Sequence, residues 1–211
     1  MLQLQDRRPR RAPARSTSLR APRPAPPAPQ RLVVRTTRLD GVRVLEPTTS
    51  FEDFRGAYVE IYNRALALAA GIDVEFVQDD ISVSTQHVLR GIHGDDSTWK
   101  LISCLHGRFY LVVVNHDASS PQYLQWEGFT LSDRNRLQVL VPPNFGNGHL
   151  VLTEQAIFHY KQSTYYDRAR QFTLAWDDPA LGIWWPVREP IVSQRDQGVR
   201  ARSGGKPGTR P

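Results

Sequence analysis

Apolar and polar residues alternate with a period close to two along most of the chain. The runs that show this pattern are residues 42–47, 57–63, 74–84, 87–93, 99–107, 109–117, 123–132, 137–143, 149–154, 156–166 and 171–178. Alternation over short runs is typical of strands in a sheet. Gly, Pro, Asp and Ser separate the runs at intervals typical of β-sandwiches and jelly rolls. We therefore predict an all-β fold.

One segment departs from this pattern. Residues 63–71, "NRALALAAG", are rich in Ala and Leu and end at Gly71, which is a plausible helix cap. The sequence therefore predicts a short helix here. It contains no Gly-rich phosphate loop, no Cys/His spacing of a zinc site and no internal repeat.

The two ends of the chain differ in composition from the part between them. Residues 1–40 contain "RAPRPAPPAPQR" and residues 197–211 contain "VRARSGGKPGTRP", both rich in Pro, Gly and charge with little to bury. Such segments cannot offset the entropy cost of becoming ordered. We expect a disordered Pro/Arg-rich tail over 1–40, one folded domain over 41–196 and a disordered basic tail over 197–211.

Charge divides in the same way. Residues 1–40 hold ten arginines against Asp6 and Asp40, and four cations follow Asp196, so a total of +6 leaves −6 for the central part. A nucleic-acid-binding domain would carry its cations on the folded face, so we expect no nucleic-acid partner.

Location is constrained by what the sequence lacks. Cys104 is the single cysteine, which excludes an internal disulfide framework and favours a reducing compartment. No apolar run approaches the roughly 20 residues of a membrane span, and the Arg-rich start lacks the apolar region of a secretory signal. We expect a cytoplasmic protein with no membrane partner.

Three cationic or titratable residues interrupt the apolar pattern of residues 89–101. Arg90, His93 and Lys100 could all face the inside of a small barrel, where they would need a negative partner or ligand. Two cations near a histidine would depress its basicity unless a carboxylate lies close. The candidate carboxylates late in the chain are Asp177, Asp178 and Asp196.

Several longer motifs resemble one known family. They are "FEDFRGAYVEIYN", "FVQDDISVS", "VLRGIHGDDSTWKLISCLHG", "VPPNFGNGHLVL", "IFHYKQSTYY", "WDDPALGIWWP" and "IVSQRD". Their order and spacing are similar to those of the dTDP-4-dehydrorhamnose 3,5-epimerase family, over about Val42 to Asp196. The resemblance implies a cupin-type jelly-roll barrel, a homodimer with exchanged strands, and a nucleotide-diphosphate-linked 4-keto-6-deoxy sugar as substrate.

The resemblance also implies catalytic roles. His93 matches the base that removes the proton next to the C4 ketone, and Asp196 matches the carboxylate that orients it. Tyr160 matches the acid that returns a proton to the opposite face, and Lys100 matches the cation that stabilises the enolate. Epimerisation by these groups needs no cofactor and no metal.

Binding residues follow from the same resemblance. Arg55, Tyr58 and Glu60 resemble a nucleotide-contacting segment that is often supplied across the dimer, and Gln78 and Arg90 resemble further nucleotide and phosphate contacts. Arginine suits bidentate contact with phosphate. Tyr58 is also consistent with a purely structural place in an interface, where aromatic residues are common.

Two departures from the family pattern concern the sugar. Where the rhamnose-pathway enzymes commonly have a His in "FAHGF", this chain has "FGNGH", with Asn147 at the His position and His149 two residues later. The chain also has "IHGDD" where these enzymes often have "LHxQ". Both features resemble the bacterial GDP-4-keto-heptose epimerases, so the nucleotide, the sugar length and the choice between C3 alone and C3 with C5 stay open. We expect Asn147 to bind the sugar or to orient His93, without acting as a second base, and His149 to contact the substrate.

Two other function classes stay open at this point. A non-catalytic nucleotide-sugar-binding cupin would be favoured by loss of the His, Tyr or Asp, but all three are present. A metal-dependent cupin would use a cluster such as His93, His116 and His149, but the usual paired H-x-H is missing.

Overall fold

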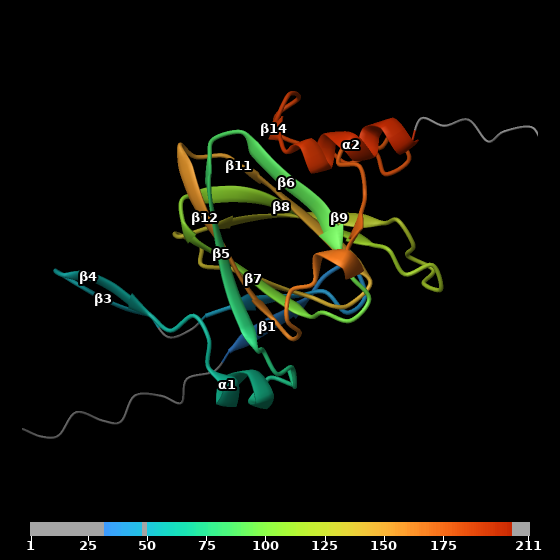
Figure 1. Cartoon of the computed structure of the whole chain (residues 1–211). Helices are drawn as coiled ribbons and strands as arrows, with labels where there is room; N and C mark the ends of the chain where they lie inside the picture. Colours follow the sequence, from blue (N-terminus) through green and yellow to red (C-terminus); the bar gives the residue numbers. More distant parts are fainter. Residues whose placement is uncertain (1–31, 48–49, 204–211) are drawn as a thin grey trace, which may run out of the picture.

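Two facing antiparallel sheets form a barrel in the computed structural model, which describes residues 32–47 and 50–203 (Figure 1). The first sheet has the order β1-β2-β10-β7-β12-β5, and its strands are β1 (Val33–Thr36), β2 (Arg43–Glu46), β10 (Gln138–Val141), β7 (Lys100–His106), β12 (Gln155–Gln162) and β5 (Gln78–Thr85). The second has the order β13-β6-β11-β8-β9, with strands β13 (Phe172–Thr173), β6 (Val88–Gly94), β11 (Phe145–Val151), β8 (Arg108–Asn115) and β9 (Trp126–Ser132). β14 (Ile191–Val192) adds to β6 in parallel. The predicted all-β, jelly-roll architecture is confirmed.

β8 shows why the interior is continuous. Its sequence "RFYLVVVN" carries apolar residues on both faces. Phe109, Leu111 and Val113 pack in the core between the two sheets. Tyr110, Val112 and Val114 face the other way, where residues 174–185 cover the second sheet. A strand buried on both faces reads as an uninterrupted apolar run, in place of strict alternation.

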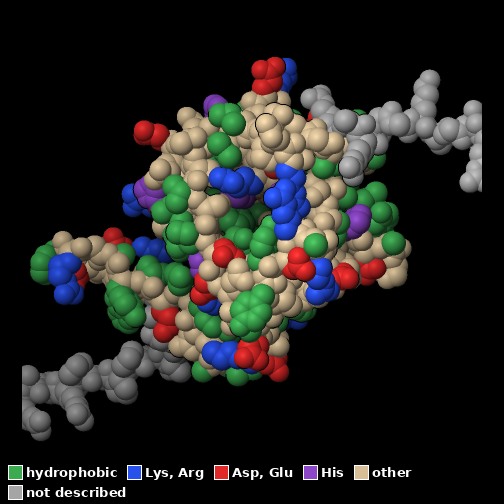
Figure 2. Space-filling model, viewed as in Figure 1, with side chains coloured by type: hydrophobic (Ala, Val, Ile, Leu, Met, Phe, Trp, Pro, Cys, Tyr) green, Lys and Arg blue, Asp and Glu red, His purple; other side chains and the backbone are tan. Residues whose placement is uncertain are grey.

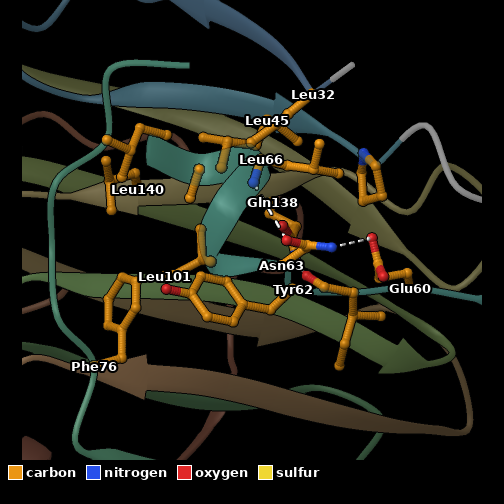
Figure 3. Close-up of a pocket in the computed structure, with 14 residues that line it drawn as sticks. Leu32, Leu45, Glu60, Tyr62, Asn63, Leu66, Phe76, Leu101, Gln138 and Leu140 are labelled. Carbon is orange, nitrogen blue, oxygen red and sulfur yellow. Dashed lines mark hydrogen bonds between the residues drawn. The ribbon is translucent and has the colours of Figure 1, made fainter. Parts of the chain in front are cut away.

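The predicted helix is confirmed as α1 (Arg64–Ala69). Asn63 caps its first turn by accepting hydrogen bonds from the backbone N–H groups of Ala65 and Leu66. Gly71 takes a φ of 77°, the left-handed conformation expected of a glycine that ends a helix. Figure 3 shows Leu66 of this helix facing Leu45, Leu101 and Leu140 on the outer face of the first sheet.

A small cavity remains at this helix–sheet contact (Figure 3), and its volume of about 20 Å³ is room for little more than one water molecule. Its lining is mostly apolar, so we assign it to imperfect packing of the α1 layer.

A hairpin projects away from the barrel. β3 (Ser50–Asp53) pairs only with β4 (Gly56–Val59) among the described strands, and Figure 1 shows the two strands extending to one side. Its large apolar side chains are exposed, with Phe54 at 98% and Tyr58 at 67% of their full accessible area. Large apolar side chains exposed on one segment usually mark a surface that contacts another molecule.

Secondary structure extends beyond both predicted boundaries of the domain. β1 begins at Val33 and pairs with β2, so residues 33–40 belong to the fold rather than to a tail. Val34 packs with the apolar cluster under α1, which supplies the burial that the Pro-rich composition further upstream lacks. At the other end α2 (Gln194–Ser203) continues past Asp196. The rest of the predicted tails, residues 1–31 and 204–211, lies outside the described residues.

Neither of the α-helices in the described part of the chain has the length and hydropathy needed to cross a lipid bilayer.

Candidate active site

A cavity of about 440 Å³ opens between the two sheets, a volume in the range of small-molecule sites. Arg90, His93 and Lys100 all line it, as the sequence predicted for three residues facing one side. Figure 2 shows this face of the molecule hollowed near its centre, with Lys and Arg side chains at the rim and a histidine inside.

A bulge in β6 explains how Arg90 and His93 share a face although they are three residues apart. In the register with β11, Asn147 pairs with His93 and His149 pairs with Arg90, so β6 has one residue more than its partner over this interval. Strict alternation would point the two side chains to opposite sides of the sheet. The extra residue brings both into the cavity.

Asp196 holds His93 from a different element. His93 Nε2 lies 2.7 Å from Asp196 Oδ1. Ser193 caps the first turn of α2, because its hydroxyl accepts from the backbone N–H of Asp196 at 3.2 Å. The motif "SQRD" therefore fixes the carboxylate at the start of a helix that packs on β6. Of the three candidate carboxylates, Asp196 is the one that the fold brings to the histidine.

Asp196 is buried but stays charged. Burial alone would raise the pKa of its carboxyl group, but the hydrogen bond and charge of His93, with hydrogen bonds from Ser193 and the Gly91 N–H, outweigh burial and lower it. Because Asp196 accepts the proton of His93 Nε2, Nδ1 is the basic nitrogen of the ring. The pair is suited to proton abstraction.

Lys100 stands at the start of β7 with its side chain almost fully buried. Burial lowers the pKa of its ammonium group, and the negative charge of Asp95 partly offsets this. Asp95 is itself fixed in the turn between β6 and β7, where its Oδ1 accepts from the N–H groups of Ser97 and Thr98. Asp95 acts on Lys100 through its charge and makes no direct ion pair with it, so the ammonium group of Lys100 stays available to a ligand in the cavity.

Tyr160 lines the cavity from β12, opposite Asp80 in the register. Burial, together with the nearby charges of Asp80 and Tyr166, raises the pKa of its hydroxyl to about 12. Tyr160 is therefore a neutral proton donor at physiological pH.

Asn147 and His149 lie next to each other on the inner face of β11 and line the same cavity. His149 is 3% exposed, and its ring stacks on Phe158 with the centroids 4.1 Å apart. Burial first, and then the nearby Arg90 and His93, lower its pKa to about 3, so the ring is neutral. Arg90 donates from Nε to Ser84 Oγ at 2.9 Å.

Four predicted binding residues do not line this cavity within the chain. Arg55 and Tyr58 lie on the projecting hairpin, where Arg55 pairs with Asp53 at 2.6 Å. Glu60 accepts from Asn63 at 3.2 Å beside α1, as Figure 3 shows. Gln78 joins β5 to the segment that follows β12, because its side chain accepts from Tyr166 N at 2.9 Å. A contact between the hairpin residues and a ligand in the cavity would have to be made in another copy of the chain.

Other lining residues were missed by the sequence analysis. They are Ile81, Ser82, Phe158, Tyr166, Arg168, Gln171, Ser193 and Arg195. Arg195 donates to Thr173 Oγ1 at 3.0 Å and so is held toward the mouth. Arg195 could have been predicted from the sequence, because it is next to Asp196 in "SQRD". No local sequence feature indicates that Arg168 lines the cavity. The described lining contains four cationic residues, Arg90, Lys100, Arg168 and Arg195, and one carboxylate, Asp196. The excess of positive charge favours binding of an anion.

A metal site finds no support. Among the described residues, no three His, Cys, Asp or Glu side chains gather so as to hold an ion. His116, one of the three histidines considered for such a cluster, instead packs against Phe172 with ring centroids 4.2 Å apart.

Known proteins share both sequence and fold with this chain. Residues 36–202 match the family described as dTDP-4-dehydrorhamnose 3,5-epimerase. The chain belongs to this family. The enzyme of that name from Methanothermobacter thermautotrophicus is 36% identical over 166 residues, which are 76% of this chain and 89% of the relative. The one from Shigella flexneri is 37% identical over 164 residues, 76% and 90% of the two chains.

Solved structures of epimerases agree with the family assignment. The dTDP-6-deoxy-D-glucose-3,5-epimerase of Legionella pneumophila, in complex with dTDP-4-keto-L-rhamnose, has a TM-score of 0.74 and 34% identity over 79% of this chain and 90% of that one. A 3'-monoepimerase from Streptomyces bikiniensis, in complex with dTDP-quinovose, has a TM-score of 0.72 and 30% identity over 77% and 84%. The chain is thus an isomerase of the epimerase class, and a non-catalytic binding module is not favoured.

Proposed function

We propose that this protein epimerises a nucleotide-diphosphate-linked 4-keto-6-deoxy sugar at C3 and C5 in deoxysugar or polysaccharide biosynthesis. The observation that carries the proposal is the His93–Asp196 pair, which opens into the same cavity as Lys100 and Tyr160. A base, a cation and an acid on the walls of one cavity are the groups that inversion next to a ketone requires.

The reaction begins with His93. Its Nδ1 removes the proton from the carbon next to the C4 ketone, and the electrons of that C–H bond move to the ketone oxygen to form an enolate. Asp196 stabilises the imidazolium that results. General-base placement of this kind contributes about 10²–10⁴-fold in rate.

Lys100 meets the negative charge that develops on the enolate oxygen. Its ammonium group is desolvated before the reaction starts, so little reorganisation is needed when charge appears. Tyr160 then donates its proton to the opposite face of the carbon, and the configuration inverts. The proton held by His93 and the tyrosinate left behind are exchanged with solvent, so the cycle consumes no oxidant and no cofactor.

The diphosphate is assigned to the mouth of the cavity. The cavity lining includes three arginines, Arg90, Arg168 and Arg195. Guanidinium groups suit phosphate oxygens. Gln78 supports this region through its hydrogen bond to the backbone of Tyr166.

The functional unit in this proposal is a homodimer. The hairpin that carries Arg55 and Tyr58 projects from the barrel (Figure 1), and its exposed aromatic residues would be covered by a second copy. Arg55, Tyr58 and Glu60 then reach the partner's nucleotide. A cytoplasmic location fits this assembly and the single, buried Cys104.

Epimerisation at C3 alone is a second candidate. The similarity to the Streptomyces bikiniensis 3'-monoepimerase favours it. Because each inverted carbon takes a proton from solvent, product formed in D₂O separates the two candidates by mass. Two deuteriums indicate C3 and C5, and one that stays at C3 after long incubation indicates C3 alone.

The test of the function uses purified protein with dTDP-, GDP- and CDP-linked 4-keto-6-deoxy sugars in D₂O. We expect deuterium in at least one product, and a fall of about 10²-fold or more in the exchange rate for His93→Ala and Asp196→Asn. Arg134→Ala, an exposed change in the turn between β9 and β10, is the control and should exchange at the wild-type rate. Folded His93→Ala protein that retained more than about a tenth of wild-type exchange would overturn the base assignment, and no exchange with any sugar would overturn the function.

A further inference from the structure

Three buried side-chain atoms in the cavity region have no hydrogen-bond partner within the described part of the chain. They are Ser82 Oγ, Asn147 Oδ1 and His149 Nε2. All three residues line the cavity that holds His93 and Lys100. Buried polar atoms in folded proteins are nearly always paired, so three unpaired atoms around one cavity indicate that a ligand supplies the partners.

The sheet registers place these atoms in order along the barrel. On β12, Gln162 pairs with Lys100, and Phe158, four residues away, pairs with Ser82. His149 stacks on the same Phe158. Ser82 and His149 therefore share a layer roughly 13 Å along the sheet from the backbone of Lys100. Asn147 lies between the two levels, paired with His93.

The charge of His149 indicates what kind of group it contacts. Its pKa, lowered to about 3 by burial and by Arg90 and His93, keeps the ring neutral. A neutral imidazole has one donor and one acceptor nitrogen, and a serine hydroxyl also does both. These groups match a hydroxyl better than a phosphate, for which the cavity already has arginines.

The position of the ketone in the proposed function then selects which hydroxyl is involved. With the C4 oxygen at Lys100, the opposite edge of a six-membered ring is C1, which carries the diphosphate, and its neighbour C2. The hydroxyl on that edge is the one on C2. The carbon that His93 deprotonates first, C3, carries its own hydroxyl next to Asn147.

We propose that Ser82 and His149 bind the C2 hydroxyl of the substrate and Asn147 its C3 hydroxyl, so that the enzyme selects sugars that keep the 2-hydroxyl over 2-deoxy sugars. This inference rests on the proposed function, because it takes the sugar's orientation from Lys100. It assigns Ser82 and His149 to specificity and leaves the proton transfers to His93 and Tyr160.

The test compares two substrates that differ only at C2, dTDP-4-keto-6-deoxyglucose and its 2-deoxy analogue, or the same pair on GDP if GDP sugars react faster. The rate of deuterium incorporation at C3 gives kcat/KM for each. We expect wild-type enzyme to favour the 2-hydroxy sugar by about tenfold or more, since a site built to bind a hydroxyl leaves its own polar groups unpaired with an analogue that lacks it.

The decisive variants are Ser82→Ala and His149→Phe, the second of which keeps an aromatic ring to stack on Phe158. Each should lower kcat/KM for the 2-hydroxy sugar, leave the 2-deoxy sugar nearly unchanged, and reduce the preference to about threefold or less. Arg134→Ala should keep the full preference. Melting temperatures show whether His149→Phe is folded, and Ser82→Ala provides an independent result if it is not.

Two outcomes would overturn the inference alone: wild-type enzyme that processes both sugars equally, or variants that slow both sugars by the same factor. Absence of exchange with both sugars and with the wider panel would overturn the proposed function and the inference with it.

Discussion

At the scale of single residues, burial shifts the pKa values of the acid, Tyr160, and the cation, Lys100, in opposite directions. Lys100 loses solvation for its charged form, so its pKa falls. Tyr160 loses solvation for its anion, and the charges of Asp80 and Tyr166 add to this, so its pKa rises to about 12. Of these two groups, Lys100 is therefore the one that changes its charge first as the pH rises.

The first prediction here concerns the alkaline limb of the pH profile. Lys100 acts as a cation, so activity falls as pH rises through its pKa, and the midpoint of kcat/KM should lie below 10.5, the usual lysine value. Tyr160→Phe should lower kcat but keep that midpoint, whereas Lys100→Arg should retain some turnover and lose the limb, because arginine stays charged. A midpoint that shifted in Tyr160→Phe and stayed in Lys100→Arg would assign the limb to the tyrosine.

At the scale of elements, the site depends on how closely β6 and β11 approach each other. Gly91 has a φ of 121°, and a Cβ added there would lie 2.5 Å from the Cα of Gly148 on the neighbouring strand. No side chain fits in that space. The bulge that turns both Arg90 and His93 inward is thus tied to glycine at this position.

The prediction at this scale is that Gly91→Ala destabilises the fold by about 2 kcal/mol or more, from backbone strain and from separation of the strands. Any folded fraction should have much reduced activity, because His93 loses its place. Gly198→Ala is the matched control: it lies in α2 with open space around it, and replacing a helical glycine should raise stability by about 0.5–1 kcal/mol. Chemical denaturation measures both. Equal stability of Gly91→Ala and wild type would show that the bulge tolerates a side chain.

At the scale of the whole molecule, two groups of exposed apolar residues lie on β5 and on the hairpin. In β5, Ile81 and Val83 are 61% and 49% exposed, while Ser82 and Ser84 on the other face are turned inward. This is the reverse of the usual arrangement and is explained if the polar face serves a ligand and the apolar face meets another chain. The homodimer in our proposal meets both needs.

Cross-complementation tests this assembly. Arg55→Ala and His93→Ala should each be nearly inactive as pure proteins. In a mixed dimer one site combines His93 of one chain with Arg55 of the other, so an equal mixture, unfolded and refolded together, should regain about a quarter of wild-type activity. His93→Ala refolded with Asp196→Asn is the control and should regain none of this activity, because His93 and Asp196 belong to the same site of one chain, so each site of the mixed dimer keeps one defect. A failure of the first mixture to exceed its separate components would place Arg55 outside the partner's site.

The sequence by itself determined the architecture and identified part of the site, including Arg90, His93, Lys100 and Tyr160, which all line the cavity. Alternation identified most of the strands, and Ala and Leu with a terminal glycine identified α1. The ordered motifs named the family, and the position of Arg90, His93 and Lys100 within an apolar run predicted that they share a face. These features are local or lie in fixed order along the chain, so a linear inspection can detect them.

Only the tertiary structure decided which of these groups meet. Residue type left Asp177, Asp178 and Asp196 as equal candidates, and only the family resemblance favoured Asp196. The fold brings Asp196 to His93 because α2 packs on β6, more than a hundred residues earlier in the chain. Composition placed the domain boundaries inside the fold at β1 and α2, and alternation gave no account of the bulge, since β1 and the bulge depend on pairing with distant segments. Ser82, an ordinary strand serine in the sequence, became a candidate for substrate recognition because the fold buries its hydroxyl beside His149 and gives it no partner in the described chain. Burial and long-range pairing are properties of the folded chain, which is why the sequence supplied the chemistry and the fold supplied its geometry.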